Sequence, residues 1–238
     1  MNNNPELIIM LTYNDITVKN AYEIFHSSKD SKAKIWGFKE IGLPLEEMKT
    51  LFAYMKEWGK TTVLEVVAYT EDECMEGAKI AKECNCDMLI GTLYYDSINA
   101  FCKENNIKYM PFIGDVSNRP SVLNGTIDSM LEQANNYLSK DVYGINILGY
   151  RYTGDAVKLN KELTSQIDAP VCLAGSIDSY ERLSEVKDAN PKYFTIGTAF
   201  FDNKFGGTFK AQIDKVCDYM NDNSDVRREV NDKEVLSA

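Results

Sequence analysis

The sequence predicts an α/β protein built as a single (β/α)8 barrel, the TIM-barrel architecture, and three observations favour this fold class. Short runs of β-branched and apolar residues alternate with longer amphipathic stretches along nearly the whole chain. Neighbouring runs are separated by roughly 20–35 residues, as right-handed strand–helix–strand units of a parallel sheet require. Eight such runs within 238 residues fit a closed barrel better than an open, doubly wound sheet.

Eight segments have the composition of strands and are followed by turn-forming residues. They are Leu7–Thr12, Lys34–Phe38, Thr62–Val67, Met88–Thr92, Lys108–Ile113, Val142–Leu148, Val171–Ala174 and Tyr193–Gly197. Pro111 lies within the fifth segment and has no N–H to donate to a neighbouring strand. We therefore expect Pro111 at a strand end or a bulge.

Amphipathic segments between these runs predict helices. The clearest are Glu46–Trp58, Glu71–Cys84, Ile127–Leu138 and Tyr180–Lys187. Thr70 and Glu73 have the spacing of a capping box at a helix start, and Asp178 and Glu181 resemble one. No repeat or linker interrupts the pattern, so we predict one barrel domain over residues 1–220 and a polar C-terminal tail over residues 221–238.

Composition excludes several classes of function. Asp and Glu number 36 against 26 Lys and Arg, and the net charge of −10 argues against a nucleic-acid partner. No apolar run approaches the roughly 20 residues that cross a bilayer, and the start MNNNPEL lacks a signal-peptide pattern. We therefore expect no membrane association and a cytoplasmic location.

Cysteine and histidine usage argues against a zinc site and against disulfides. The six cysteines show no paired C-x-x-C spacing, and His26 is the single histidine. This composition indicates a reduced chain without a Cys/His zinc site, so we expect no metal and no cofactor. It also disfavours any catalytic triad that depends on histidine.

The carboxyl ends of barrel strands carry the chemistry of this fold, and two charged residues fall there. The apolar neighbours of Glu65 face the helices, so alternation points Glu65 into the barrel. Trp36 and Phe38 cover the helix side of the second strand, which leaves Lys39 facing inward beside Glu65. A Lys–Glu pair at a pocket mouth suits proton transfer, while the alternative is an ion pair that only closes the barrel.

Glycines end the seventh and eighth strands and predict a phosphate site. Gly175 and Ser176 follow one strand, and Gly197 and Thr198 follow the next. Glycine lets backbone N–H groups approach an anion, and these two loops hold phosphate in many barrels. The alternative is that each glycine only permits a tight turn.

Further candidates lie in other loops at the same end. Asp15 is a third candidate catalytic residue, although the same position suits a cap of the first helix. We predict five substrate-binding residues, namely Asn14, Thr92, Arg119, Asn146 and Arg151.

The glycine loops also carry a resemblance to known proteins. The segments AGSI (174–177) and TIGTA (195–199) resemble the phosphate grip of the ribulose-phosphate-binding barrel superfamily, which includes phosphoribosylanthranilate isomerase. The nearest local likeness is to N-acetylmannosamine-6-phosphate epimerases. Lys39 in GFKEIG resembles their lysine at the end of the second strand, and GYRYTGD (149–155) resembles their segment after the sixth. Their catalytic Glu after the seventh strand is replaced here by Ala174 and Gly175, so their acid/base pair does not carry over.

A weaker resemblance is to the glycerol-3-phosphate-responsive antiterminators, which are regulators with a similar barrel and glycine loop. The first hypothesis is therefore a metal-independent enzyme acting on a small phosphorylated sugar or phosphoribosyl compound, as an isomerase, epimerase or aldolase-type lyase. Lys39 and Glu65 would transfer protons, or Lys39 would form a Schiff base. The alternative is a non-catalytic barrel that senses a phosphorylated metabolite. Barrels of this group often dimerise, so the resemblance also leaves a homodimer open.

Overall fold

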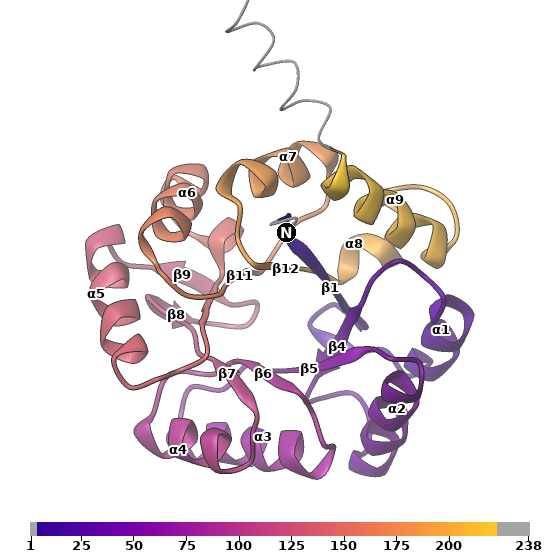
Figure 1. The fold of residues 1–238 in the computed structure, drawn as a ribbon, viewed down its shortest axis with the longest axis horizontal. Helices are drawn as coiled ribbons and strands as arrows, with labels where there is room; N and C mark the ends of the chain where they lie inside the picture. Colours follow the sequence, from indigo (N-terminus) through magenta and orange to yellow (C-terminus); the bar gives the residue numbers. More distant parts are fainter. Residues whose placement is uncertain (1–3, 223–238) are drawn as a thin grey trace, which may run out of the picture.

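The computed structural model describes residues 4–222, which form a parallel sheet curled into a barrel inside a ring of helices (Figure 1). The barrel strands, in spatial order, are β10 (Ile145–Ile147), β11 (Val171–Leu173), β12 (Tyr193–Ile196), β1 (Glu6–Met10), β4 (Ile35–Lys39), β5 (Thr61–Val66), β6 (Met88–Gly91) and β7 (Lys108–Met110). The predicted α/β barrel is thus confirmed, and each of its eight strands overlaps a predicted segment.

Helices follow the strands around the outside of the barrel. They are α1 (Ala21–Ser28), α2 (Leu45–Glu57), α3 (Glu71–Glu83), α4 (Asp96–Glu104), α5 (Ile127–Leu138), α6 (Ala156–Gln166), α7 (Tyr180–Ala189) and α9 (Phe209–Asn221), with the short η1 (Gly149–Arg151) and α8 (Thr198–Phe201) at the ends of β10 and β12. Asn221, predicted to begin the tail, is instead the last residue of α9. Asp222 caps the end of α9, and residues 223–238 of the predicted tail lie outside the described residues.

Two hydrophobic layers hold the barrel together. The larger lies between sheet and helices and includes Trp36, Phe38 and Phe52. The smaller fills the barrel interior with side chains such as Ile8, Val63 and Cys172. The interior side chains come from alternate positions of each strand, so the inward face of the sheet is fixed in every strand.

The seam between β7 and β10 is the weakest pairing of the cylinder, and Pro111 explains why. The strand β7 ends at Met110, as the position of Pro111 predicts. The Pro111 carbonyl accepts a hydrogen bond from Asn146 N at 2.9 Å, but the proline nitrogen donates nothing in return. Tyr109 O also accepts hydrogen bonds from Tyr143 N at 3.1 Å and Gly144 N at 3.3 Å, but the one bridge across the seam joins Phe112 to Asn146. The two sides therefore do not form a continuous ladder.

Helix starts follow the sequence signals at α3 but not at α7. Thr70 and Glu73 form the expected capping box. At α7 the cap is Ser179, whose extended backbone lets its hydroxyl accept a hydrogen bond from Arg182 N. The predicted box at Asp178 is therefore wrong by one residue, because the serine hydroxyl reaches the first turn and the Asp178 carboxylate does not cap it.

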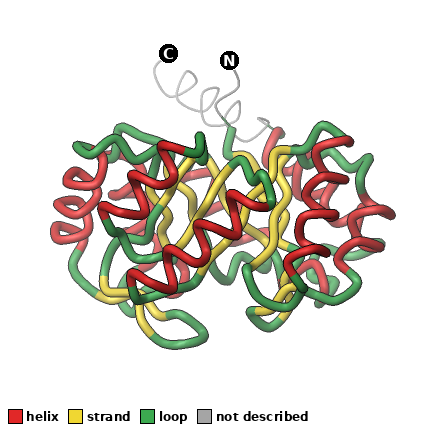
Figure 2. Tube along the Cα trace, turned by 90° about the horizontal axis from the view of Figure 1, so that it is seen from below, coloured by secondary structure: helices red, strands yellow, loops and turns green. Residues whose placement is uncertain are grey.

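Two β-hairpins extend the carboxyl end of the barrel. One consists of β2 (Thr12–Tyr13) and β3 (Ile16–Thr17) and follows β1, and the other consists of β8 (Asp115–Ser117) and β9 (Val122–Asn124) and follows β7. Figure 2 shows their short yellow strands projecting beyond the ring of helices at one end. The sequence patterns did not predict either hairpin.

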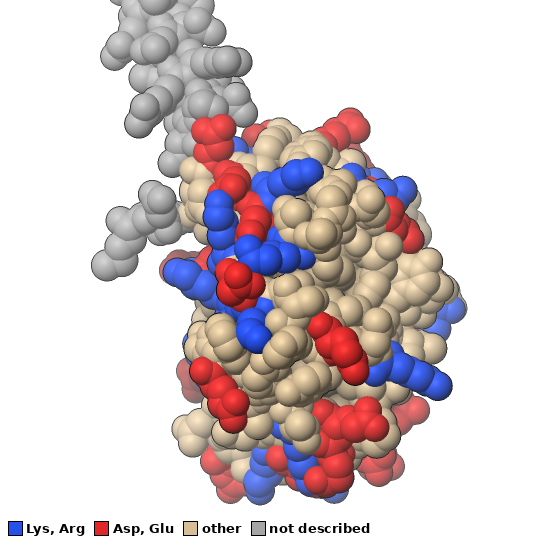
Figure 3. Space-filling view, turned by 90° about the vertical axis from the view of Figure 1, so that its right-hand side faces the viewer, with Lys and Arg blue, Asp and Glu red and all other residues tan. Residues whose placement is uncertain are grey.

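The surface mixes both signs of charge. On the side that carries α1 and α9, Lys and Arg are interspersed with Asp and Glu, and the described part of this face shows no continuous basic area (Figure 3). The six cysteines are buried and form no disulfide. Within residues 4–222, no helix is both long and apolar enough to cross a bilayer.

Candidate functional site

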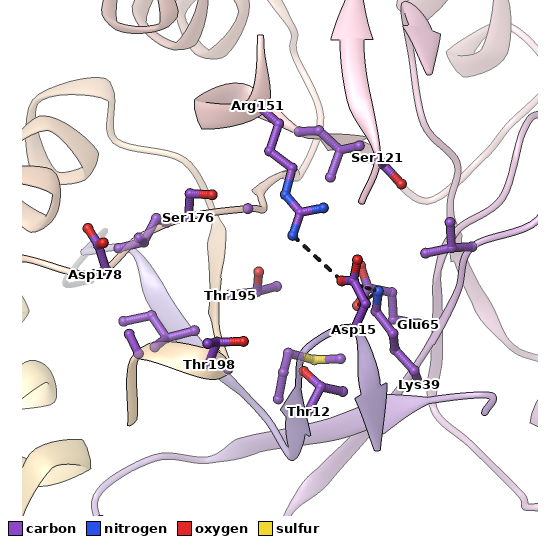
Figure 4. A pocket seen from close by; sticks show the side chains of 18 of the residues that line it. Thr12, Asp15, Lys39, Glu65, Ser121, Arg151, Ser176, Asp178, Thr195 and Thr198 are labelled. Carbon is purple, nitrogen blue, oxygen red and sulfur yellow. Dashed lines mark hydrogen bonds and ion pairs between the residues drawn. The ribbon is translucent and has the colours of Figure 1, made fainter. Parts of the chain in front are cut away.

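A cavity of about 270 Å³ opens at the carboxyl end of the barrel. Its walls come from the ends of β1, β4, β5 and β12, from η1, and from the loop after β11. Lys39, Glu65 and Asp15 gather at one side, and Ser176, Asp178 and Thr198 lie at the other (Figure 4). We call these sides the charged wall and the loop wall.

Lys39 and Glu65 form the base of the charged wall. They are paired residues of β4 and β5, so their side chains leave the sheet next to each other on its inner face. Lys39 Nζ lies 3.9 Å from Glu65 Oε2, and the two residues are 7% and 9% exposed. The structure thus brings together the two residues that alternation placed side by side.

Asp15 is the third residue of the charged wall and comes from the hairpin that follows β1. Asn14 and Asp15 have φ of +49° and +65° and form the two-residue turn of the β2–β3 hairpin. Positive φ at both turn residues is the type I′ geometry, which matches the twist of the flanking strands. Asp15 Oδ1 accepts a hydrogen bond from Lys39 Nζ at 2.9 Å. Asp15 does not cap α1, which begins at Ala21 after Asn20.

Thr17 holds this hairpin over the barrel. Its hydroxyl accepts a hydrogen bond from Lys39 N at 2.9 Å and donates one to Lys39 O at 2.8 Å. Thr17 N also donates to Ile41 O at 3.0 Å. The position of Asp15 is therefore tied to the same backbone that carries Lys39.

The charged wall is a coupled set of charges. Burial lowers the pKa of Lys39, but the charge of Glu65 and the hydrogen bond to Asp15 outweigh it, so the pKa lies above its ordinary value. Burial raises the pKa of Asp15, but Lys39 and Arg151 outweigh it, so the pKa is lowered. Arg151 Nη2 stands 3.6 Å from Asp15 Oδ1. At neutral pH this wall therefore presents an ammonium group hydrogen-bonded to an ionised Asp15.

Glu40, which follows Lys39 at the end of β4, is a charged group that sequence reasoning did not select as a site residue. Its Oε1 accepts a hydrogen bond from Val67 N at 3.3 Å, while its buried Oε2 has no hydrogen-bond partner. Burial and the neighbouring charge of Glu65 raise the pKa of Glu40 to about 7. A carboxyl group behind the charged wall thus titrates near neutral pH.

The loop wall is shaped by its backbone. Gly175 has a φ of +87° and Ser176 one of +53°, so two successive residues lie in the left-handed region, which glycine adopts without steric cost. A Cβ on Gly175 would lie 3.0 Å from Arg151 Cγ, and one on Gly197 would lie 2.7 Å from Thr12 Oγ1. Side chains at either position would press into neighbouring groups of the site.

Charged side chains on the loop wall have both signs. Lys204 and Arg151 line the cavity beside Gly175 and Thr198, but so do Asp178 and Asp202. Asp178, Asp202 and Lys204 are all exposed, so solvent screens their charges of both signs. An anion bound here would therefore depend mainly on the backbone and on Arg151, which is less exposed.

Arg119 and Asn14 line a second cavity of about 470 Å³ that lies between the two hairpins. Arg119 Nη2 donates a short hydrogen bond to the carbonyl of Val67. Tyr69 OH donates to Asn118 O at 2.7 Å and contacts Ser121 Oγ at 3.0 Å, which fixes the tip of the β8–β9 hairpin. Ser121 lines both cavities, and no sequence signal had selected it.

Thr92 and Asn146 lie away from the cavities. Gly91 and Thr92 both have positive φ, which breaks the alternation of β6, and Thr92 Oγ1 bonds Tyr109 OH at 2.7 Å in the layer between sheet and helices. Asn146 is fully buried beside Cys172 inside the barrel, and neither amide atom has a hydrogen-bond partner. Neither residue contributes to the cavity walls, so the structure does not support a direct contact with substrate.

Among residues 4–222, no group of three or more His, Cys, Asp or Glu side chains is arranged to hold a metal ion. The charged wall instead neutralises its two carboxylates with Lys39 and Arg151.

Comparison with known proteins defines the class of fold and no more. No family model and no curated sequence matches the chain. Solved structures of (β/α)8 barrels do match. Orotidine 5'-phosphate decarboxylase from Pyrococcus horikoshii has a TM-score of 0.66 at 13% identity, over 91% of this chain and 99% of that one.

Two further matches come from groups that the sequence resembles. The N-acetylmannosamine-6-phosphate 2-epimerase from Clostridium perfringens has a TM-score of 0.60 at 14% identity, over 82% of this chain and 86% of that one. The glycerol uptake operon antiterminator from Listeria monocytogenes has a TM-score of 0.55 at 14% identity, over 81% and 91%. At these identities the resemblance is confirmed for the fold alone.

Proposed function

We propose that this chain is an enzyme that acts on a small phosphorylated carbonyl compound, by isomerisation, epimerisation or aldol-type cleavage. The observation that carries the proposal is the in-register pair of Lys39 and Glu65 with Asp15 above it, facing the glycine loops across one cavity. Two of the structural matches are an orotidine 5'-phosphate decarboxylase and an N-acetylmannosamine-6-phosphate 2-epimerase, whose names include phosphorylated compounds, and this supports the proposed class of substrate.

In this proposal the loop wall holds the phosphate. Gly175, Ser176, Gly197 and Thr198 supply the backbone approach, and Lys204 supplies a cation. The phosphate would thereby fix the position of the carbonyl end of the substrate, which extends toward the charged wall.

The charged wall then does the chemistry. The three reaction types share an intermediate in which negative charge develops on the carbonyl oxygen, and a fixed ammonium group stabilises that charge. Lys39 is suited to this role because its raised pKa keeps it protonated. A Schiff base requires a neutral amine. The raised pKa of Lys39 therefore favours proton transfer and electrostatic stabilisation by this residue over covalent catalysis. In isomerisation or epimerisation, Glu65 or Asp15 would accept the proton from the substrate carbon next to the carbonyl. In aldol-type cleavage the same carboxylate would accept the proton of the substrate hydroxyl as the C–C bond breaks.

Two measurements on the whole chain test the proposal. The first is thermal unfolding against sugar phosphates, inorganic phosphate and the unphosphorylated sugars. A ligand at about 100 times its dissociation constant adds about 2.7 kcal/mol, which raises the melting temperature by several degrees. Stabilisation by the phosphorylated members alone is the expected result, and equal stabilisation by the unphosphorylated sugars would contradict a phosphate site.

The second measurement incubates the best ligand with the protein in deuterated water and follows it by NMR. Proton abstraction next to the carbonyl exchanges that hydrogen for deuterium even when no net product accumulates, and cleavage gives new resonances. A ligand that binds and returns without exchange or conversion would favour the non-catalytic sensor instead.

A further inference from the structure

The larger cavity between the hairpins differs in character from the polar cavity beside it. The 470 Å³ cavity is lined by Ile16, Ile41, Val67 and Pro120, which present apolar surface. It is continuous with the polar cavity, because both are lined by Asp15, Lys39, Val67, Ser121, Arg151 and Thr198. A molecule that enters the site can therefore occupy both spaces at once, with the Lys39–Asp15 pair at the boundary.

Two apolar side chains at this opening are exposed to solvent. Ile16 is 50% exposed on the β2–β3 hairpin, and Ile41 is 37% exposed in the loop after β4. The two loops are packed tightly together, since a Cβ on Gly42 would lie 2.8 Å from Ile16 Cγ2. The exposed isoleucines are thus held at fixed positions facing a cavity, and contiguous apolar surface of this kind marks a binding site.

Arginine side chains supply the other surface of this cavity. The Arg119 guanidinium is held by the Val67 carbonyl, and Arg151 is held by packing on Gly175 and by Asp15. A guanidinium fixed in this way offers a planar, weakly hydrated surface that stacks on flat rings. Two aliphatic residues and two fixed guanidinium groups suit a ring better than a chain of hydroxyl groups.

We propose that the cavity between the hairpins is a subsite for an aromatic ring carried by the substrate. This inference rests on the proposed function, since the phosphorylated end of the same molecule would lie in the polar cavity. The substrate class is then a phosphorylated compound with an aromatic group attached beyond its reactive carbon. A sugar phosphate that carries only hydroxyl groups leaves Ile16, Ile41 and Val67 uncovered.

Three stable probes separate the two halves of the site. They are methyl riboside 5-phosphate, phenyl riboside 5-phosphate and unphosphorylated phenyl riboside, and their affinities for the whole chain are measured by calorimetry. Burial of the ring between the hairpins gives phenyl riboside 5-phosphate about tenfold to a hundredfold higher affinity than its methyl counterpart. Equal affinity of the two phosphates, or a weaker phenyl compound, overturns the aromatic subsite.

A variant locates the ring. Ile41→Ser changes an exposed side chain that lines the apolar cavity but not the polar one, and it should remove most of the phenyl preference. The matched control is Val157→Ser on α6, which removes an apolar side chain of 36% exposure outside both cavities and should keep the preference. A phenyl preference that survives Ile41→Ser places the ring elsewhere and also overturns the subsite.

The unphosphorylated probe distinguishes failure of the subsite from failure of the proposed function. If phenyl riboside binds as tightly as its phosphate, and Ile41→Ser weakens both, the subsite stands and the phosphate assignment is wrong. If methyl riboside 5-phosphate binds and the phenyl group adds nothing, the phosphate assignment stands and the subsite is wrong. Binding of none of the three probes overturns both.

Discussion

The charged wall and the loop wall of the cavity hold their polar groups by different means. On the charged wall, Lys39, Glu65 and Asp15 are side chains fixed by strand register and by one another's charges. On the loop wall, the shape comes from backbone, with positive φ at Gly175 and Ser176. Removing side-chain atoms should therefore damage the first wall most, and adding them should damage the second.

The largest effect is expected from removing the cation of the charged wall. Lys39→Met leaves Glu65 and Asp15 facing each other without the ammonium group, and turnover of the best phosphorylated substrate should fall by about 10²–10⁴-fold. Affinity for inorganic phosphate, held on the other wall, should change little. Steady-state kinetics and calorimetry measure the two effects separately.

The matched control for that variant is Lys56→Met. Lys56 forms a half-buried ion pair with Asp87 at 2.9 Å, away from both cavities. The Lys56→Met variant should be less stable than the wild type but should keep its turnover. An equal loss of turnover in both variants would mean that Lys39 acts only through the stability of the barrel.

The next effect concerns the carboxyl group behind the charged wall and depends on pH. The pKa of Glu40 is raised to about 7 in the folded chain, so the folded state binds this proton more tightly than the unfolded state. The contribution of Glu40 to the free energy of unfolding therefore falls as pH rises from about 4.5 to about 7. Glu40→Gln removes this dependence, and above pH 7 its free energy of unfolding should exceed that of the wild type by on the order of 3 kcal/mol.

Melting temperatures of both proteins between pH 4.5 and pH 8.5 measure the difference. Glu104→Gln on the exposed surface of α4 controls for the loss of one carboxylate. A gain of Glu40→Gln over the wild type that is independent of pH would contradict the raised pKa.

On the loop wall, adding a methyl group should impair the site, just as removing side-chain atoms should impair the charged wall. Gly175→Ala adopts a positive φ at a cost of about 1–2 kcal/mol and also presses on Arg151. Gly59→Ala has the same backbone problem at a φ of +68° but has open space around its Cβ. Both variants should lose similar stability, while affinity for inorganic phosphate should fall about tenfold in Gly175→Ala alone. Equal phosphate affinity in the two variants would remove the loop wall from the site.

The smallest effect is expected at an exposed cation. Lys204→Ala should weaken phosphate binding by about threefold at low salt, because exposed charges contribute little and are screened. The difference should vanish near 1 M salt. Lys158→Ala on α6 removes an exposed lysine outside the cavity and should leave the affinity unchanged. A loss much larger than threefold would make Lys204 a principal ligand of the anion.

The sequence predicts the charged wall in detail, but it does not predict the two hairpins that extend over the site. Side-chain alternation is a local property of a strand, so the inward direction of Lys39 and Glu65 followed from their neighbours alone. The hairpins have strands of two or three residues, which are too short to show alternation. The signal present at Asn14 was a pair of turn-forming residues between two-residue strands, and it competes with the signal for a helix cap.

Thr92, which the sequence places wrongly, and Glu40, which it does not select, show how the conformation of the loops overrides the sequence pattern. Thr92 continues the alternation of β6 by sequence, but two successive residues of positive φ turn it outward. The Glu40 side chain accepts the hydrogen bond from Val67 N that a backbone carbonyl would otherwise accept. Hydrophobic periodicity gives no signal for such a contact. Both features depend on the loops that follow the strands, and these are the least regular part of the fold.

The single bridge between β7 and β10 gives the β8–β9 hairpin a second role. A parallel strand with unpaired backbone groups is a template on which another chain can add a strand. Beyond the bridge, Leu123 of the hairpin pairs with Tyr152, and Thr153 N donates to Leu123 O at 3.1 Å. The hairpin therefore joins the two sides of the seam beyond the bridge, at the carboxyl end of the barrel. The hairpin that lines both cavities through Ser121 also closes the seam of the barrel. We therefore expect sequence changes in this hairpin to affect the solubility of the protein as well as ligand binding.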